Sequence, residues 1–389
     1  MAKLTQRDRL EKLLSQDIST LVSQERAKVD RIVADSMKSL VLFGAGQLGK
    51  ISLASLRQQG VEPIAFADNN PQLWGRSVDG LKVISPQEAA KQFAQKAIFV
   101  VTVYTSEPVR QQLMRLGVRV VTLASIAWKY PAGLLPYGVL VDVSHKIFRE
   151  ADDVRKTFEL WADDASQREY LTQLEWRLSP APDVLTPHLP VDQIYFPNDL
   201  TDLSPDEVFV DCGAFDGDTI RGYLQRQGSH FKHIIAIEPD RINYQKLLTS
   251  FSAFPESIRS RLIALNLAVG AREETVQFNM TGTMGSAIGT GTYKVECMPL
   301  DTILKDRMPT YIKMDVEGAE PDALAGAHQV LEKYLPVLAI SVYHRQEHLW
   351  QIPLLIQSVS QDYRLFLRRY CDECWESICY AIPTTRLRQ

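Results

Sequence analysis

The chain has 389 residues, of which 45% are hydrophobic and 23% charged, with a formal net charge of −4 and 5 cysteines. Its length favours roughly two or three globular domains, and its mildly acidic balance argues against a nucleic-acid partner, which would require a basic surface. Few cysteines, no secretory signal in residues 1–8 and no run of about 18 apolar residues lead us to expect a cytoplasmic protein without a membrane partner.

Residues 1–35 are predicted to be helical. The segment is charged, lacks Gly and Pro, and repeats apolar residues such as Leu10, Leu13 and Leu14 at helical spacing. We expect one or two amphipathic helices that pack on the rest of the protein. A dimerisation arm is the alternative, and a homo-oligomer would follow from it.

Residues 36–140 alternate between short apolar runs and helical stretches, which predicts a small Rossmann-like domain. Strands are expected at residues 40–43, 63–67, 81–84, 97–101 and 119–123. The first strand is followed by the spacing Gly44-x-Gly46-x-x-Gly49, and Asp68 stands at the tip of the second strand. This pattern is typical of a dinucleotide site, although a scaffold without a ligand fits equally well.

Residues 141–200 are predicted to form a helical linker that ends in a Pro-rich stretch, and residues 201–389 form the last domain. In that domain, strands are expected at residues 208–211, 233–237, 262–265, 275–278, 293–296, 311–315, 337–342, 363–367 and 377–381. Helices are expected at residues 244–251, 323–334 and 349–359. The last two strands would close the sheet as an antiparallel hairpin.

A glycine-containing turn follows the first strand of the last domain and has the form Asp211-x-Gly213-x-x-x-Gly217. Glycine allows the backbone to pass close to a ligand, as nucleoside cofactors require at this place in an α/β sheet. The next strand ends in Glu238, whose carboxylate suits the donor hydroxyls of a ribose. The two elements together predict a nucleoside-cofactor site.

The charge of this turn indicates which cofactor it binds. Asp216 and Asp218 add negative charge, which would repel a pyrophosphate but suits a cationic cofactor without phosphate. S-adenosylmethionine carries both an amine and a sulfonium, so we predict this cofactor rather than NAD for the last domain. The predicted contacts within the turn are Asp211, Gly213, Ala214, Phe215 and Gly217.

Four segments of the last domain together resemble the FkbM family of S-adenosylmethionine-dependent methyltransferases. These segments are residues 208–219, 235–239, 311–320 and 341–344. The resemblance implies an α/β fold with a class I, doubly wound sheet of seven strands, and O-methylation of sugars, polyketides or other metabolites. It also implies that Glu238 contacts the ribose of the cofactor, and that Asn266 and Ala268 contact its adenine.

The domain at residues 36–140 has a resemblance of its own. It is similar to the nucleotide-sugar-binding domain that precedes sugar acyltransferases, and the similarity rests on residues 41–46, 66–70 and 75–83. The resemblance implies that the second nucleotide site, at Gly44, Gly46, Gly49 and Asp68, could hold part of a saccharide substrate.

Three residues at strand ends are predicted to carry the chemistry. Methyl transfer from a sulfonium is an in-line displacement, which needs an aligned hydroxyl and a base within hydrogen-bond reach. Asp315 and Glu317 follow one predicted strand and His344 follows the next, so the three would converge over the methyl group. Asp315 could instead bind the cofactor amine, Glu317 could be an acid at a helix N-terminus, and His344 could be structural.

A metal site is an alternative at the same place. Asp315, Glu317 and His344 could bind a divalent ion that positions a diol, but their sequence spacing is not compact, so we predict a metal-free site. Cys371-x-x-Cys374 departs from the simpler family tail. It lacks a second cysteine pair and a nearby histidine, so no zinc site is predicted there.

The sequence thus predicts an S-adenosylmethionine-dependent O-methyltransferase that acts on a small-molecule or saccharide acceptor. Its methyltransferase domain would be preceded by a second, smaller Rossmann-like domain. Two alternatives remain open: a NAD-dependent, sugar-modifying oxidoreductase that uses the turn at Gly44, and a non-catalytic nucleotide-sugar-binding protein.

Overall fold

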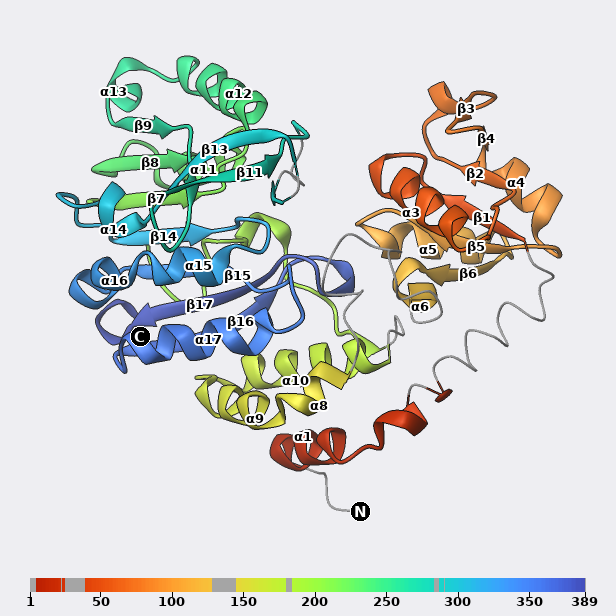
Figure 1. The fold of residues 1–389 in the computed structure, drawn as a ribbon, viewed down its shortest axis with the longest axis horizontal. Helices are drawn as coiled ribbons and strands as arrows, with labels where there is room; N and C mark the ends of the chain where they lie inside the picture. The colour runs from red at the N-terminus through yellow and green to blue at the C-terminus, as the bar shows by residue number, and fades with distance from the viewer. Residues whose placement is uncertain are drawn as a thin grey trace. The chain divides into compact units, whose positions relative to one another are not determined.

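The computed structural model describes residues 5–21, 23–24, 39–127, 145–179, 184–282, 287–289 and 291–388. These residues fold into two compact units, and neither unit is continuous in sequence (Figure 1). Unit 1 consists of Met1–Ala151, Arg168–His188 and Cys371–Trp375, and unit 2 consists of Asp152–Gln167, Leu189–Tyr370 and Glu376–Gln389. The segment 141–200 is therefore divided between the units, and the predicted boundary at residue 140 lies outside the described residues.

Unit 1 contains a six-stranded sheet in the order β3-β4-β2-β1-β5-β6, and β3 runs antiparallel to β4. The strands are β1 (Leu40–Phe43), β2 (Ala65–Ala67), β3 (Ser77–Val78), β4 (Leu81–Ile84), β5 (Ile98–Val101) and β6 (Arg119–Thr122). All four residues of β1 are buried, because Leu42 packs into one apolar cluster while Val41 and Phe43 pack into another. Alternate side chains of a strand point to opposite faces, so both faces of this sheet are covered.

The helices of unit 1 follow the predicted pattern. They include α1 (Gln6–Leu14), α3 (Gln47–Gln58), α4 (Pro86–Phe93), α5 (Ser106–Arg115), α6 (Leu123–Ala127) and α8 (His145–Arg149). α4 begins as expected, since the Ser85 hydroxyl accepts a hydrogen bond from the Glu88 amide and Pro86 stands at the first helical position. Residues 25–35 of the predicted N-terminal helices lie outside the described part of the chain.

A short segment from near the end of the chain completes unit 1. Asp372 lies in η4 (Asp372–Cys374), and its carboxylate accepts a hydrogen bond of 2.9 Å from the Glu107 amide at the start of α5. The Trp375 ring lies edge-on to Tyr104, with 5.4 Å between their centroids. Cys374 is buried in the core of this unit, and all five cysteines of the chain are free thiols.

Unit 2 contains a seven-stranded sheet in the order β16-β17-β15-β14-β7-β8-β9. The strands are β7 (Val208–Cys212), β8 (His233–Ile237), β9 (Leu262–Leu265), β14 (Tyr311–Met314), β15 (Val337–Ser341), β16 (Tyr363–Arg369) and β17 (Ser377–Pro383). β17 runs antiparallel to both its neighbours, as predicted for a closing hairpin, and the other pairs are parallel. The chain winds outward from β7 through β8 and β9, then returns to add β14 and β15, so the sheet is doubly wound.

A smaller sheet and a set of helices accompany this sheet. The smaller sheet has the order β10-β13-β11-β12, with β10 (Ala268–Val269), β11 (Glu274–Asn279), β12 (Ala287–Ile288) and β13 (Tyr293–Met298). The helices are α9 (Ala151–Leu160), α11 (Asp218–Gln227), α12 (Arg241–Ser252), α13 (Glu256–Arg259), α14 (Leu300–Ile303), α15 (Glu320–Ala325), α16 (His328–Tyr334) and α17 (His348–Val359). A further helix, α10 (Asp164–Leu178), is shared, because its residues from Arg168 onward belong to unit 1. Within the described ranges, each helix is too short or too polar to cross a bilayer.

The single helix predicted over residues 323–334 is wrong, because α15 and α16 are separate helices. Gly326 ends α15, and a Cβ added to it would lie 2.0 Å from the carbonyl oxygen of Gly270. The chain therefore passes directly over a neighbouring loop at this point, which only glycine allows.

Elsewhere in the unit, stacked aromatic rings fill the core, such as Phe209 and Tyr223 with 5.2 Å between centroids.

Candidate active site

The parallel strands of unit 2 carry the predicted residues to one edge of the sheet. Gly213 follows β7, Glu238 follows β8, Asp315 follows β14 and His344 lies just beyond β15. The winding direction reverses between β7 and β14, and a doubly wound sheet binds ligands in the crevice at such a switch point. The residues singled out from widely spaced motifs therefore lie on neighbouring strands.

The turn after β7 has a backbone that requires glycine. Gly213 has φ +80°, and a Cβ added to it would lie 1.9 Å from the carbonyl oxygen of Asp315. Gly217, at the start of α11, has φ +85°, and Phe215 between them also adopts a left-handed φ of 47°. The turn is therefore pressed against the end of β14, which leaves no room for a side chain at its first glycine.

Asp211 lies below this turn, within β7, and is fully buried. Its carboxylate forms an ion pair of 2.9 Å with Lys313 Nζ, which also donates a 2.7 Å hydrogen bond to the carbonyl of Gly213. Burial raises the pKa of Asp211 to about 6, although the charge of Lys313 acts in the opposite direction. Burial alone would lower the pKa of Lys313, but the charges of Asp211 and Asp315 raise it. This ion pair holds the turn in place from inside the sheet.

Glu238 connects the end of β8 to the turn. One carboxylate oxygen accepts a 2.7 Å hydrogen bond from the Phe215 amide and the other a 2.8 Å bond from the Asp240 amide. Burial raises the pKa of Glu238 to about 7, although these two bonds favour the ionised form. Each carboxylate oxygen can accept a second hydrogen bond, so the side chain can also receive bonds from two hydroxyl groups.

The residues predicted at the adenine lie close by in sequence and differ in setting. Asn266 follows β9, and its side-chain amide donates to the carbonyls of Glu238 and Pro239 at 2.9 and 3.1 Å. Ala268 is buried in β10 of the smaller sheet. Asn266 thus fixes the loop that carries Glu238, and contact of either residue with adenine stays a prediction.

The three residues predicted to carry the chemistry come together around one imidazole. His344 Nε2 lies 3.3 Å from Asp315 Oδ1 and 3.7 Å from Glu317 Oε2, while Nδ1 lies 2.8 Å from Glu320 Oε1. Burial alone would lower the pKa of His344, but the charges of Glu320, Glu317 and Asp315 raise it to about 10. The three carboxylates around the ring therefore favour its protonated form.

The loop between β14 and α15 shapes this cluster. Glu317 and Gly318 have positive φ angles of 54° and 101°, and burial raises the pKa of Glu317 to about 7. Glu320 is fully buried, and its carboxylate accepts a 2.9 Å hydrogen bond from the Val316 amide and lies 3.3 Å from His348 Nδ1. Burial would raise the pKa of Glu320, but His344 and His348 lower it. Glu320 is therefore a charged partner beneath His344.

Sequence reasoning missed three residues at this site. The Tyr195 and Tyr343 hydroxyls donate to the two carboxylate oxygens of Asp315, at 2.8 and 3.2 Å. Glu376 lies just before β17, and burial together with the charge of Asp315 raises the pKa of Glu376 to about 8. Tyr343 lies inside the matched segment 341–344, whereas Tyr195 lies in the Pro-rich stretch that reads as a linker.

Tyr195 is held by a network of other tyrosines. It has an unusual φ of 65°, its amide donates a 3.0 Å hydrogen bond to the Tyr380 hydroxyl, and its carbonyl accepts one from the Tyr311 hydroxyl. The Tyr380 hydroxyl in turn donates to the Tyr370 hydroxyl at 2.9 Å. A bulky residue with positive φ is strained, so these bonds must compensate the strain.

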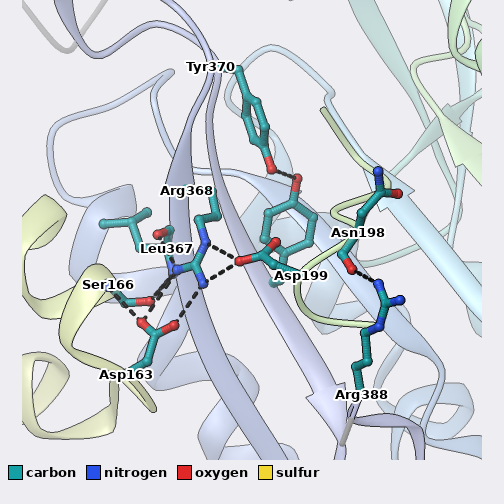
Figure 2. A network of polar contacts seen from close by, with 9 residues as sticks. Asp163, Ser166, Asn198, Asp199, Leu367, Arg368, Tyr370 and Arg388 are labelled. Atoms are coloured by element: carbon teal, nitrogen blue, oxygen red, sulfur yellow. Dashed lines mark hydrogen bonds and ion pairs between the residues drawn. The ribbon is translucent and has the colours of Figure 1, made fainter. Parts of the chain in front are cut away.

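The same stretch is clamped to β16 a few residues further on. Arg368 Nη2 lies 2.9 Å from a carboxylate oxygen of Asp199 and 2.7 Å from one of Asp163 (Figure 2). Ser166 accepts a 2.9 Å hydrogen bond from the same guanidinium. Arg368 thus joins the segment that carries Tyr195 and the start of α10 to one strand of the sheet.

The turn of unit 1 repeats the bonding pattern of Glu238. One carboxylate oxygen of Asp68 accepts a 2.8 Å hydrogen bond from the Ala45 amide and the other a 2.7 Å bond from the Asn70 amide. Gly44 has φ +107°, and a Cβ added to Gly49 would lie 1.9 Å from the carbonyl oxygen of Gly44. Gly44 and Gly49 therefore have backbone reasons to be glycine, whereas a Cβ added to Gly46 would meet no atom within 4 Å.

The strand order of unit 2 and the turn and acid at its switch point define a class I methyltransferase fold. The family model of the methyltransferase FkbM domain matches residues 211–374. This part of the chain therefore matches the FkbM methyltransferase family, as the sequence resemblance predicted. A second family model, described as C2185-like, N-terminal, matches residues 36–121 of the Rossmann-like domain.

Solved structures share this fold. Methyltransferase FkbM from Methylobacillus flagellatus KT has a TM-score of 0.78 and 24% identity, over 97% of this chain and 99% of that chain. Two other solved structures are similar to only part of this chain, and their TM-scores are low. Precorrin-6y C5,15-methyltransferase from Geobacter metallireducens GS-15 has a TM-score of 0.31 and 11% identity, over 47% of this chain and 84% of its own. UDP-D-quinovosamine 4-dehydrogenase from Vibrio fischeri has a TM-score of 0.19 and 22% identity, over 22% of this chain and 77% of that chain. No curated protein matches the chain.

Proposed function

We propose that this methyltransferase uses S-adenosylmethionine to methylate a hydroxyl oxygen of a sugar or sugar-containing metabolite. The observation that carries the proposal is the shared edge of the sheet in unit 2. The glycine turn and Glu238, which suit a nucleoside, lie on strands next to those that carry Asp315 and His344. A cofactor in the crevice would thus present its methyl group to the acid and histidine cluster.

The cofactor half of the site suits a ribose and a positive charge. Glu238 can accept hydrogen bonds from both ribose hydroxyls through oxygens already fixed by backbone amides. Asp218 leaves a negative charge at the turn that attracts the sulfonium and the amine, while Asp211 is paired with Lys313 and Asp216 with Arg221. The predicted contacts of Gly213, Ala214, Phe215, Gly217, Asn266 and Ala268 belong to the same proposal.

The acceptor half of the site supplies carboxylates. As the hydroxyl oxygen attacks the methyl carbon, the carbon–sulfur bond breaks, S-adenosylhomocysteine leaves, and the hydroxyl proton must pass to a base. Glu317 is the base that we propose, because burial brings its pKa to about 7, near the working pH. Asp315, whose two oxygens accept from Tyr195 and Tyr343, would orient the acceptor.

Calorimetry tests the cofactor assignment directly. S-adenosylmethionine and S-adenosylhomocysteine should bind the full-length chain, and Glu238→Ala should abolish binding while the far-ultraviolet circular dichroism is retained. Unchanged affinity in that variant would refute the role of Glu238. A panel of sugars and hydroxylated metabolites with radiolabelled methyl donor then identifies the acceptor, and transfer to nitrogen alone would refute O-methylation.

For the turn of unit 1 we propose a nucleotide-bearing ligand at Gly44, Gly46, Gly49 and Asp68. The proposal is supported by the repeated pattern in which both oxygens of one acid accept backbone amides. A thermal-shift panel with NAD and nucleotide-sugars tests it, since a ligand that binds the native state raises the melting temperature. Loss of the shift in Asp68→Asn would support the site, and no shift with any nucleotide would refute it.

A further inference from the structure

His344 presents an unusual buried nitrogen to two carboxylates. Its side chain is 5% exposed, and neither ring nitrogen makes a well-aligned hydrogen bond, although Nε2 lies 3.3 Å from Asp315 Oδ1 and 3.7 Å from Glu317 Oε2. Two donor atoms that each lie about 2.0–2.2 Å from one metal ion are themselves separated by about 3–3.6 Å. The separations around Nε2 are close to those between neighbouring ligands of a single cation.

The other nitrogen of the same ring is held as metal-bound histidines are held. Nδ1 lies 2.8 Å from Glu320 Oε1, and Glu320 is itself fixed by the Val316 amide and by His348. A carboxylate that receives the second N–H of a histidine sets its tautomer and orientation and raises its basicity toward a metal. Donor atoms of Asp315, Glu320 and His344 all lie within 4.8 Å of one another. Glu320 faces Nδ1, so it fits the orienting position rather than direct coordination.

The charge of the cluster also favours a cation. Asp315, Glu317 and Glu320 place three carboxylates around one imidazole in a largely buried site. Lys313, two residues before Asp315, already forms an ion pair with Asp211, and the Arg345 guanidinium lies beside Gly318. Buried carboxylates are costly unless they are paired or coordinate a metal, and a bound dication offsets several such charges at once.

We propose that this cluster binds one divalent cation of the Mg²⁺ or Mn²⁺ type through Asp315, Glu317 and His344, with Glu320 as the positioning residue behind the histidine. The inference rests on the proposed function, because the cation would use its remaining positions to hold the acceptor hydroxyl and a neighbouring oxygen. Oxygen ligands with one imidazole suit these ions. The cation takes the place of the proton on Nε2.

The proposal gives the cation a defined part in methyl transfer. A hydroxyl bound to a dication loses its proton more readily, and the proton passes to the carboxylate oxygen of Glu317 that does not face the metal. The hydroxyl oxygen then bonds to the methyl carbon as the carbon–sulfur bond breaks, which leaves a methyl ether and S-adenosylhomocysteine. The acceptor class that fits is a vicinal diol or a hydroxyl beside a carbonyl, since both offer two oxygens to one ion.

The experiment measures the metal itself, without cofactor or acceptor. The full-length chain is dialysed against EDTA and titrated with Mn²⁺, and free Mn²⁺ is followed by electron paramagnetic resonance. We expect one Mn²⁺ per chain, and binding weakened by about tenfold or more in Asp315→Asn, His344→Ala and Glu320→Gln. His328→Ala is the matched control, because His328 is an exposed histidine beside Glu332 in α16. If His344→Ala does not fold, as judged by circular dichroism, Glu317→Gln replaces it.

The outcomes are separate from those of the proposed function. No stoichiometric Mn²⁺ binding, or binding that persists in all the cluster variants, would overturn the metal site, even if calorimetry finds that S-adenosylmethionine binds. Methyl transfer that is undiminished in excess EDTA would overturn the part given to the cation. Binding of Mn²⁺ that is lost in the cluster variants and kept in His328→Ala supports the site, whatever the fate of the cofactor proposal.

Discussion

Replacing Glu238 by glutamine tests how the protein recognises the ribose of its cofactor. Hydroxyl groups donate hydrogen bonds to a carboxylate, so the ionised form of Glu238 is the form that binds. With a pKa of about 7, the apparent Kd for S-adenosylmethionine should rise about tenfold between pH 8 and pH 6. Glu238→Gln cannot titrate, so its Kd should be independent of pH over this range.

The magnitude of the loss at pH 8 follows from the two backbone bonds of Glu238. Its oxygens accept from the Phe215 and Asp240 amides at 2.7 and 2.8 Å, and in glutamine one of these acceptors becomes an NH₂ donor. A ribose hydroxyl that loses its bond to a charged acceptor weakens binding by about 1.5–3 kcal/mol, whereas the amide left without an acceptor costs stability in the free and the bound protein alike. We expect affinity at pH 8 to fall by at least roughly tenfold, measured by calorimetry.

Asp68→Asn is the matched control, because Asp68 has the same bonding pattern in unit 1. It should leave the affinity for S-adenosylmethionine and its pH dependence unchanged. A wild-type Kd that does not vary between pH 6 and pH 8 would refute the reasoning, and so would a loss in Asp68→Asn as large as that in Glu238→Gln.

The same pKa fixes the sign of a stability change. The folded pKa of Glu238, about 7, lies above its ordinary value of 4.5, so the folded state holds this proton more tightly than the unfolded state. The protonated Glu238 side chain contributes about 3 kcal/mol to stability below pH 4.5, and this contribution is lost as the pH rises through 7. The melting temperature of the protein without cofactor should therefore fall between pH 4.5 and pH 7. The rise in melting temperature that S-adenosylmethionine produces should become larger over the same interval.

Three further substitutions and one control substitution test the supports of the site. Gly213→Ala should lower the melting temperature and weaken S-adenosylmethionine binding, since its Cβ would lie 1.9 Å from the Asp315 carbonyl oxygen. Gly222→Ala in α11 is the control, because its Cβ would meet no atom within 4 Å, and it should stabilise the protein by about 0.5–1 kcal/mol. Tyr195→Phe removes one hydrogen-bond donor from Asp315 and should lower the free energy of unfolding, measured in urea, by about 1–2 kcal/mol. The Kd for S-adenosylmethionine should stay unchanged, and a higher Kd would contradict a role confined to the acceptor side. Arg368→Met should destabilise by about 1–3 kcal/mol, less than a fully buried pair because Asp199 is half exposed, and an unchanged urea midpoint would argue against the clamp.

The sequence predicts those parts of the site that depend on local pattern and on strand ends. An apolar run that ends in an acid places Glu238 and Asp315 at the carboxyl edge of the sheet, because a parallel strand in a doubly wound fold has only one such end. Gly213 is equally predictable, since a turn between strand and helix needs a left-handed backbone. The closing hairpin follows from the pattern of its two strands, whereas the sheet of seven strands is implied by the resemblance to the FkbM family.

The remaining parts depend on contacts between residues far apart in sequence. Tyr195 stands 120 residues from Asp315, inside a Pro-rich stretch whose composition indicates only a linker. Glu320 has the pattern of an acid at a helix start, and only the fold turns it toward His344. The separation of α15 from α16 depends on a neighbouring loop that touches Gly326. Tertiary contacts of this kind leave no periodic signal in the chain.

The segment Cys371–Trp375 has a consequence for how the protein is made. Unit 1 begins with the earliest described residues, yet its core includes Cys374, and Asp372 holds the start of α5. A ribosome delivers the chain from the N-terminus, so unit 1 must wait until residues 371–375 have been synthesised before its last contacts form. Folding of this unit during translation should therefore stop at an incomplete intermediate, and a chain terminated before residue 371 should remain prone to aggregation and proteolysis.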